Sequence, residues 1–89
     1  MIQYLLIMSK TKIAQTLRNV FQPVFLNVID DSAGHAGHAG AKEGGHFTVD
    51  IVSPAFNGKK PIERHRMVYA ALEPLKSSIH ALSIRARGT

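Results

Sequence analysis

Five histidines are the residues of this chain best suited to metal chemistry. They are His35, His38, His46, His65 and His80, and the chain contains no cysteine. Imidazole binds zinc, copper, nickel and iron, whereas a closed structural zinc site usually takes four protein ligands, often thiolates. Two or three histidines without a thiolate therefore suggest a site that another molecule completes. Mixed histidine and cysteine ligation is established chemistry for a two-iron cluster.

Two of these histidines lie in an unusual segment, residues 31–45 (DSAGHAGHAGAKEGG), in which Gly-His-Ala occurs twice in tandem. Compact domains rarely keep a long structureless loop that has no function. The segment is thus predicted to carry His35 and His38 on a flexible arm. A plain Gly/Ala linker is the alternative reading of the same composition.

The rest of the chain predicts helices and strands in the order α-β-β-α-β. A first helix capped by Ser9 or Thr11 is expected to end before Pro23 and to carry one apolar stripe, composed of Ile13, Leu17, Val20 and Phe21. Strands are predicted at residues 24–29, 46–52 and 80–86, from β-branched content and alternation. A second helix is expected from Pro61 to about residue 75, with a kink or an early end at Pro74.

This order predicts one α+β domain with a three-stranded mixed sheet and both helices on one face. The first two strands should be antiparallel, and the last two, joined through a helix, should be parallel. Residues 1–7 are expected to be an extension that is disordered or loosely docked, with the domain at 8–89. This apolar start is too short to span a bilayer and has no signal-peptide pattern, so no membrane association is expected.

The topology predicts which histidines meet. The loop ends where strand 46–52 begins, and parallel strand 80–86 begins at the same edge of the sheet, with His80 as its first residue. His35, His38 and His80 should therefore share one end of the molecule. His46 should lie there too, facing away from the buried residues of its strand, whereas His65 should lie at the opposite end.

A structural role is the alternative interpretation for two of these histidines, His80 and His65. Alternation places His80 on one face with Leu82 and Ile84. A histidine at the edge of the core is therefore the alternative to a metal ligand at this position. The helical spacing places His65 on the same face as Val68, Leu72 and Leu75, which favours a structural role.

The formal net charge is +5, which suits nucleic acid or an acidic protein without choosing between them. The basic residues Lys59, Lys60, Arg64 and Arg66 are the candidate nucleic-acid contacts, and a solvated surface is the alternative. A KH domain that clamps nucleotides uses a Gly-x-x-Gly loop, and the turn at 57–60 (NGKK) lacks that spacing.

Several motifs together resemble the BolA-like protein family. They are FQPVFLNVIDDS, HF-VDIVSPAFNGKKPIERHRMVYAAL and IHALSIRAR, and they cover most of the chain past residue 8. The Phe-x-Gly-Lys turn at 56–59, the Arg-His-Arg at 64–66 and the Ile-His-Ala-Leu at 79–82 occur in the family's order and spacing. The resemblance implies a class II KH-like α/β fold.

The resemblance also implies partnership with a monothiol glutaredoxin. In such pairs a [2Fe-2S] cluster is shared with a glutaredoxin cysteine and glutathione, and none is bound by the isolated chain. By position, His80 takes the role of the strand ligand and His35 or His38 that of the loop ligand. The loop is longer than in some members and has two candidate histidines, so the choice between them is left open.

The resemblance further links the chain to iron–sulfur cluster assembly, iron regulation and stress responses. The alternative function is a transcriptional regulator that binds DNA through the basic surface. No enzyme is expected, because no nucleophile–base arrangement can be placed at one end of the fold. A weak homodimer is a further expectation, and the expected compartment is a bacterial cytoplasm, with the mitochondrial matrix as the second choice.

Overall fold

The computed structural model describes residues 2–31 and 45–89, and the side chains of residues 8–31 and 45–89. The elements follow the predicted order, with two short 3₁₀ helices added. They are α1 (Ile2–Phe21), β1 (Phe25–Asp30), β2 (Gly45–Val52), η3 (Pro54–Phe56), α2 (Pro61–Ala71), η4 (Glu73–Ser78) and β3 (Ile79–Arg87). The predicted α-β-β-α-β order is confirmed.

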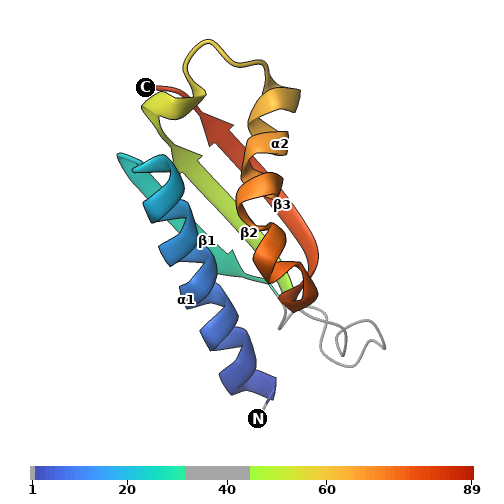
Figure 1. Cartoon of the computed structure of the whole chain (residues 1–89). Helices are drawn as coiled ribbons and strands as arrows, with labels where there is room; N and C mark the ends of the chain where they lie inside the picture. The colour runs from blue at the N-terminus through green and yellow to red at the C-terminus, as the bar shows by residue number, and fades with distance from the viewer. Residues whose placement is uncertain (1, 32–44) are drawn as a thin grey trace.

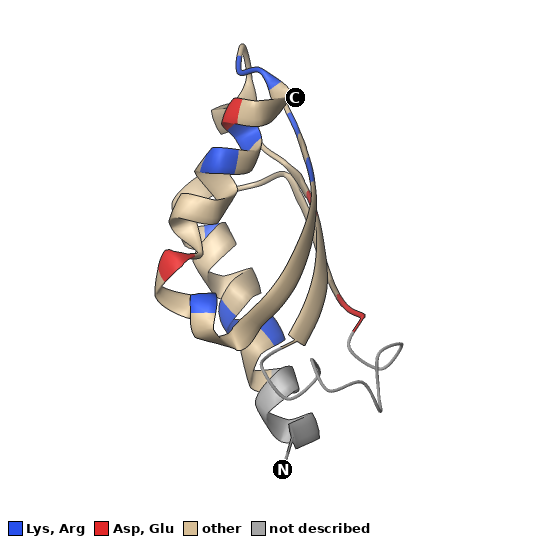
Figure 2. Cartoon of the chain, turned by 90° about the vertical axis from the view of Figure 1, so that its right-hand side faces the viewer, with Lys and Arg blue, Asp and Glu red and all other residues tan. Residues whose placement is uncertain are grey.

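The three strands form one mixed sheet in the order β1-β2-β3. β1 pairs with β2 antiparallel, and β2 pairs with β3 parallel, as predicted. Both helices cover the same face of the sheet, and the other face carries no helix among the described residues (Figures 1 and 2). Along β2, buried residues alternate with half-buried ones, because successive side chains of a strand point to opposite faces.

Helix α1 differs from its prediction at the N-terminal end. The helix begins at Ile2, so the predicted start with a cap at Ser9 or Thr11 is wrong. The segment from residue 2 to 8 (IQYLLIM) contains no proline or glycine and is rich in good helix formers, so the helix continues through it. The domain boundary at residue 8 stays a prediction.

The apolar stripe of α1 is narrower than predicted. Ile13, Leu17 and Phe21 are buried, whereas Val20 is 55 % exposed. Val20 lies next to Phe21 in sequence, about 100° around the helix, and so points past the edge of the contact with the sheet.

Helix α2 begins and ends as the proline positions indicate. Pro61 occupies the first helical position, and the Lys60 N–H donates to Glu63 Oε1 at 2.9 Å. The helix ends at Ala71, and η4 contains Pro74, which confirms the early end. η4 thus turns the chain from α2 into the start of β3.

The core lies between the helices and the covered face of the sheet. Its buried residues come from α1, β1, β2, η3, α2 and the turn after α2, and β1 contributes only Val28. They are Ile13, Leu17, Phe21, Val28, Phe47, Val49, Ile51, Phe56, Val68 and Leu72. Ser53 is the one buried polar residue in the described part of the chain, and it is satisfied. Its Oγ donates to the Phe21 carbonyl at 2.6 Å and accepts from the Ala55 N–H at 3.1 Å, which ties the end of α1 to η3.

No described helix has an apolar stretch long enough to cross a bilayer.

Candidate functional site

His46 and His80 meet at the edge of the sheet where β2 and β3 begin. Their ring centroids are 5.0 Å apart, and the ring planes are inclined by 45°. His46 is half-buried and His80 is exposed. The predicted convergence of these two histidines at one end of the sheet is therefore present in the structure.

A shift in strand register explains how the two rings meet. Gly45 pairs with Ile79 and His46 pairs with Ala81, so β3 has one extra residue, His80, opposite that step of β2. Such bulges interrupt the alternation of side chains and redirect one of them. Ile79 still packs against the core, and His80 points away from it.

The predicted face of His80 is therefore wrong. Alternation placed His80 on one face with Leu82 and Ile84, which both pack against the core. The bulge instead moves the imidazole out of that row and beside His46. The alternative of a core-edge histidine is excluded by the same observation, because the residue is exposed.

His46 is the site residue that the sequence reasoning left out of its ligand set. The sequence predicts His46 at the correct edge of the sheet, but on the face of β2 opposite the buried residues. The bulge in β3 brings His80 beside His46, and nothing in the sequence reveals a bulge at this step.

The other histidines are not part of this pair. His35 and His38 lie outside the described residues. His65 is exposed on α2, so its predicted place on the buried face with Val68 is wrong. His65 lies three positions before Val68, which turns its side chain about 60° around the helix axis from that of Val68. Among the described residues, no group of three or more His, Asp or Glu side chains is positioned to hold a metal ion.

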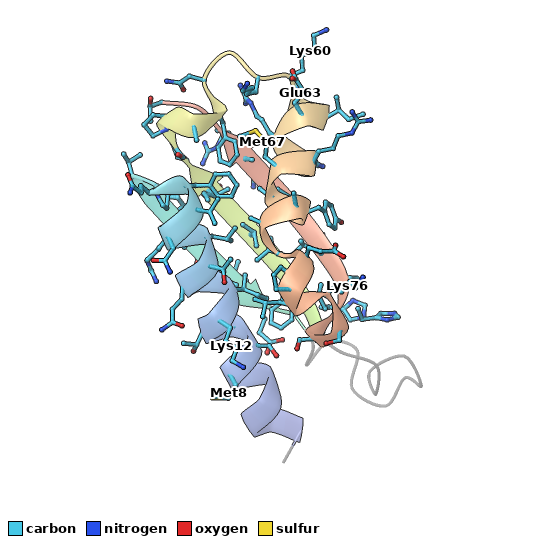
Figure 3. All side chains as sticks on the ribbon, viewed as in Figure 1. Met8, Lys12, Lys60, Glu63, Met67 and Lys76 are labelled. Atoms are coloured by element: carbon cyan, nitrogen blue, oxygen red, sulfur yellow. The ribbon has the colours of Figure 1, made fainter. Side chains whose placement is uncertain are left out.

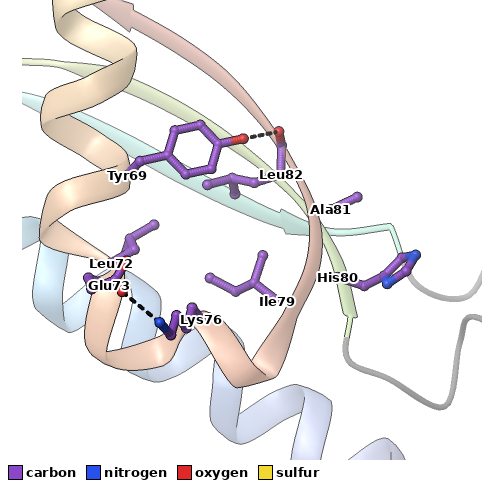
Figure 4. A pocket seen from close by; sticks show the side chains of 8 residues that line it. All are labelled: Tyr69, Leu72, Glu73, Lys76, Ile79, His80, Ala81 and Leu82. Atoms are coloured by element: carbon purple, nitrogen blue, oxygen red, sulfur yellow. Dashed lines mark hydrogen bonds and ion pairs between the residues drawn. The ribbon is translucent and has the colours of Figure 1, made fainter.

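An apolar pocket of about 140 Å³ adjoins His80. It is formed by the end of α2, η4 and the start of β3, and its lining residues are Tyr69, Leu72, Glu73, Lys76, Ile79, His80, Ala81 and Leu82. Figure 4 shows Leu72, Ile79 and Leu82 inside it and the His80 ring directed away from them, toward the outside. The pocket and the imidazole thus lie next to each other at the start of β3.

The rim of the pocket is polar. The Tyr69 hydroxyl donates to the Leu82 carbonyl at 3.3 Å, and Lys76 Nζ lies 2.9 Å from Glu73 Oε1. The hydrogen bond to Glu73 and its negative charge raise the pKa of Lys76. Because this pair is exposed, it contributes little to stability.

The candidate nucleic-acid residues lie at the other end of the molecule. Lys59 and Lys60 precede α2, whereas His80 follows its far end, and Figure 3 shows Lys60 and Lys76 at opposite ends of the helical layer. Lys and Arg also mark the last part of β3 near the C-terminus (Figure 2). The basic group and the histidine pair are therefore separate surfaces.

The four basic candidates are not equivalent. Lys59, Lys60 and Arg66 are exposed, whereas Arg64 is half-buried. Arg64 Nη1 donates to the Ala86 carbonyl at 3.3 Å, and its Nε is buried without a partner in the described structure. Arg64 therefore ties α2 to β3 and is the least available of the four for a phosphate.

Comparison with known proteins identifies the family. Residues 17–89 match the family model described as BolA-like protein. The chain is 44 % identical over 78 residues to the DNA-binding transcriptional regulator BolA of Escherichia coli, covering 86 % of this chain and 72 % of that protein. It is 43 % identical over 79 residues to BolA-like protein 1 of Bos taurus, covering 88 % of this chain and 54 % of that protein. The chain belongs to the BolA-like protein family.

Solved structures of the family have the same fold. The BolA domain of SufE1 from Arabidopsis thaliana superposes with a TM-score of 0.76 at 46 % identity, covering 89 % of this chain and 90 % of that one. BolA1 from Mus musculus gives a TM-score of 0.73 at 40 % identity, covering 90 % of this chain and 64 % of that one. The predicted α+β class with a three-stranded mixed sheet is confirmed.

The relatives differ in length and in name. The chain matches only 22 % of SufE-like protein 1, which is named chloroplastic/mitochondrial. These names span a bacterium and plant organelles, and the description BolA-like protein states no catalytic activity.

Proposed function

We propose that this chain is the partner of a monothiol glutaredoxin and that His80 supplies one ligand to a [2Fe-2S] cluster shared between them. The cluster is the cargo of the pair, which shares or delivers it in iron–sulfur cluster assembly or iron regulation. The observation that carries the proposal is the exposed His80 imidazole, turned out of the core by the bulge at the start of β3.

The donor set explains why a partner is needed. The chain has no cysteine, and iron–sulfur clusters are held mainly by thiolates, with histidine replacing cysteine at some irons. A glutaredoxin cysteine and glutathione would supply the sulfur, and this chain the nitrogen. His35 or His38 is proposed as a second ligand, because the loop that carries them joins β2 at Gly45, which pairs with Ile79.

The pocket beside His80 supports a docking role. Its apolar floor, formed by Leu72, Ile79 and Leu82, lies next to the ligand. A partner side chain buried there would hold the complex together and fix the distance between the imidazole and the incoming cluster. Apolar pockets next to a few polar groups are the usual form of such anchor sites. We place this activity in a bacterial cytoplasm, with the mitochondrial matrix as the alternative.

Visible circular dichroism tests the proposal directly. Cluster-loaded monothiol glutaredoxin is titrated with the wild-type chain and with His80→Ala, and the visible bands report the ligands around the iron. The wild-type chain is expected to change the spectrum and retain the cluster, and His80→Ala to lose that change. The matched control is His65→Ala, which removes an exposed histidine from α2 and should behave as wild type.

The assigned role is rejected if His80→Ala gives the wild-type spectrum and the wild-type affinity for the partner. Loss of the effect in His65→Ala as well would point to a general defect of folding instead of ligation, which far-ultraviolet circular dichroism of each variant identifies.

A DNA-binding regulator is the second candidate function. The observation that favours it is the 44 % identity to a protein named DNA-binding transcriptional regulator, together with exposed Lys59, Lys60 and Arg66. Gel shifts at two salt concentrations discriminate the two functions. Sequence-specific binding that persists at physiological salt favours the regulator, whereas weak, salt-sensitive binding means only a basic surface.

A further inference from the structure

We infer that His46 and His80 form a two-imidazole site through which the isolated chain binds a divalent transition-metal ion: Cu²⁺, Ni²⁺ or Zn²⁺. The inference shares His80 with the proposed function but does not depend on it, because no glutaredoxin or cluster is involved. It adds His46, which the proposed ligand set does not contain.

The geometry of the two rings carries the inference. Two imidazoles bound to one tetrahedral ion, with metal–nitrogen distances of about 2.1 Å, hold their ring centres about 5 Å apart. The observed separation of the His46 and His80 centroids is 5.0 Å. The tilt of 45° shows that the rings are not stacked face to face, and binding of one ion would require rotation about the side-chain bonds that turns one nitrogen of each ring toward it.

The backbone beneath the pair is held firmly. His46 belongs to central strand β2, and its carbonyl accepts a hydrogen bond from the Asp31 N–H at 2.7 Å. His80 lies between Ile79 and Ala81, which both pair with β2. Sites on paired strands lose less conformational entropy when they bind than sites on loops do.

The chemistry of the pair selects the class of ion. Neutral imidazole suits copper, nickel, zinc and iron, and among divalent ions of the first row the affinity is highest for copper. Two protein ligands leave the remaining coordination positions open to water or to ligands from another molecule. The site is therefore an open one, of the kind that accepts a further donor.

The test uses Cu²⁺ as the probe and the full-length chain. Binding is measured by calorimetry in the presence of a competing weak chelator, and electron spin-echo spectroscopy counts the imidazoles on the copper. The wild-type chain is expected to bind one tightest Cu²⁺ through two imidazoles. His46→Ala and His80→Ala should each weaken that site at least tenfold and reduce the count to one.

Two further variants separate this site from the other histidines. His35→Ala/His38→Ala and His65→Ala should each keep the tightest Cu²⁺ with two imidazoles. His46→Gln, which keeps a polar side chain of similar size on β2, should reproduce the loss seen with His46→Ala if ligation and not folding is responsible.

The inference is overturned if the tightest Cu²⁺ survives in His46→Ala or disappears in the loop double variant. It is equally overturned if the wild-type chain shows only one imidazole on the copper, which would leave the two rings in simple contact. None of these results bears on the glutaredoxin experiment, in which cluster ligation by His80 is measured without added copper.

Discussion

Phe47→Ala is expected to lower the free energy of unfolding by about 3–5 kcal/mol, the usual cost of truncating a fully buried phenylalanine. Phe47 is 1 % exposed and lies on central strand β2, in contact with the core. Small domains have total stabilities of about 5–15 kcal/mol. The variant should therefore be marginally folded, and the midpoint of its urea unfolding curve should fall sharply.

A matched control separates burial from strand position. Ile29 on β1 is 42 % exposed, so Ile29→Ala should cost less than about 1 kcal/mol. Unfolding followed by far-ultraviolet circular dichroism measures both variants. Equal losses in the two variants, or a loss below about 1 kcal/mol in Phe47→Ala, would show that the core does not lie where the structure places it.

His80→Cys is expected to retain the shared cluster but to lower its reduction potential by an amount on the order of 100–300 mV. Clusters in which histidine replaces cysteine on one iron have potentials well above those of clusters ligated only by cysteine. Restoring a thiolate at this position should reverse that effect. A spectroelectrochemical titration of the complex with glutaredoxin measures the potential.

Ser83→Cys provides the control for His80→Cys. Ser83 is exposed on the same strand, three residues farther along β3. It adds a thiol to the chain without placing it at the proposed ligand position, so the potential should stay at the wild-type value. An unchanged potential in His80→Cys, or the same shift in Ser83→Cys, would remove His80 from the ligand set.

The sequence predicted the architecture well because its signals are local. Alternation in residues 46–52 predicted the buried face of β2, and Phe47, Val49 and Ile51 are buried. Pro61 and Pro74 predicted both limits of α2, since proline acts on the backbone of its immediate neighbours. Strand directions followed from the order of the elements and the lengths of their connections.

The errors occurred where neighbours distant in sequence decide the outcome. His80 was placed on the wrong face because the bulge is a property of how β3 pairs with β2, which no pattern within 80–86 records. Val20 and His65 follow helical spacing but lie beyond the area that the sheet covers. The convergence of His46 and His80 was predicted as a shared end of the molecule, and the contact between their rings needed three-dimensional information.

Nitrogen hyperfine spectroscopy of the shared cluster measures iron ligation by His80. The reduced cluster is prepared in a complex of unlabelled glutaredoxin with a chain whose histidines carry ¹⁵N. A directly bound imidazole should give a strong nitrogen coupling that changes from ¹⁴N to ¹⁵N with the labelling of this chain and is lost in His80→Ala. A cluster that shows no such coupling, or one that keeps it without His80, would exclude His80 as an iron ligand.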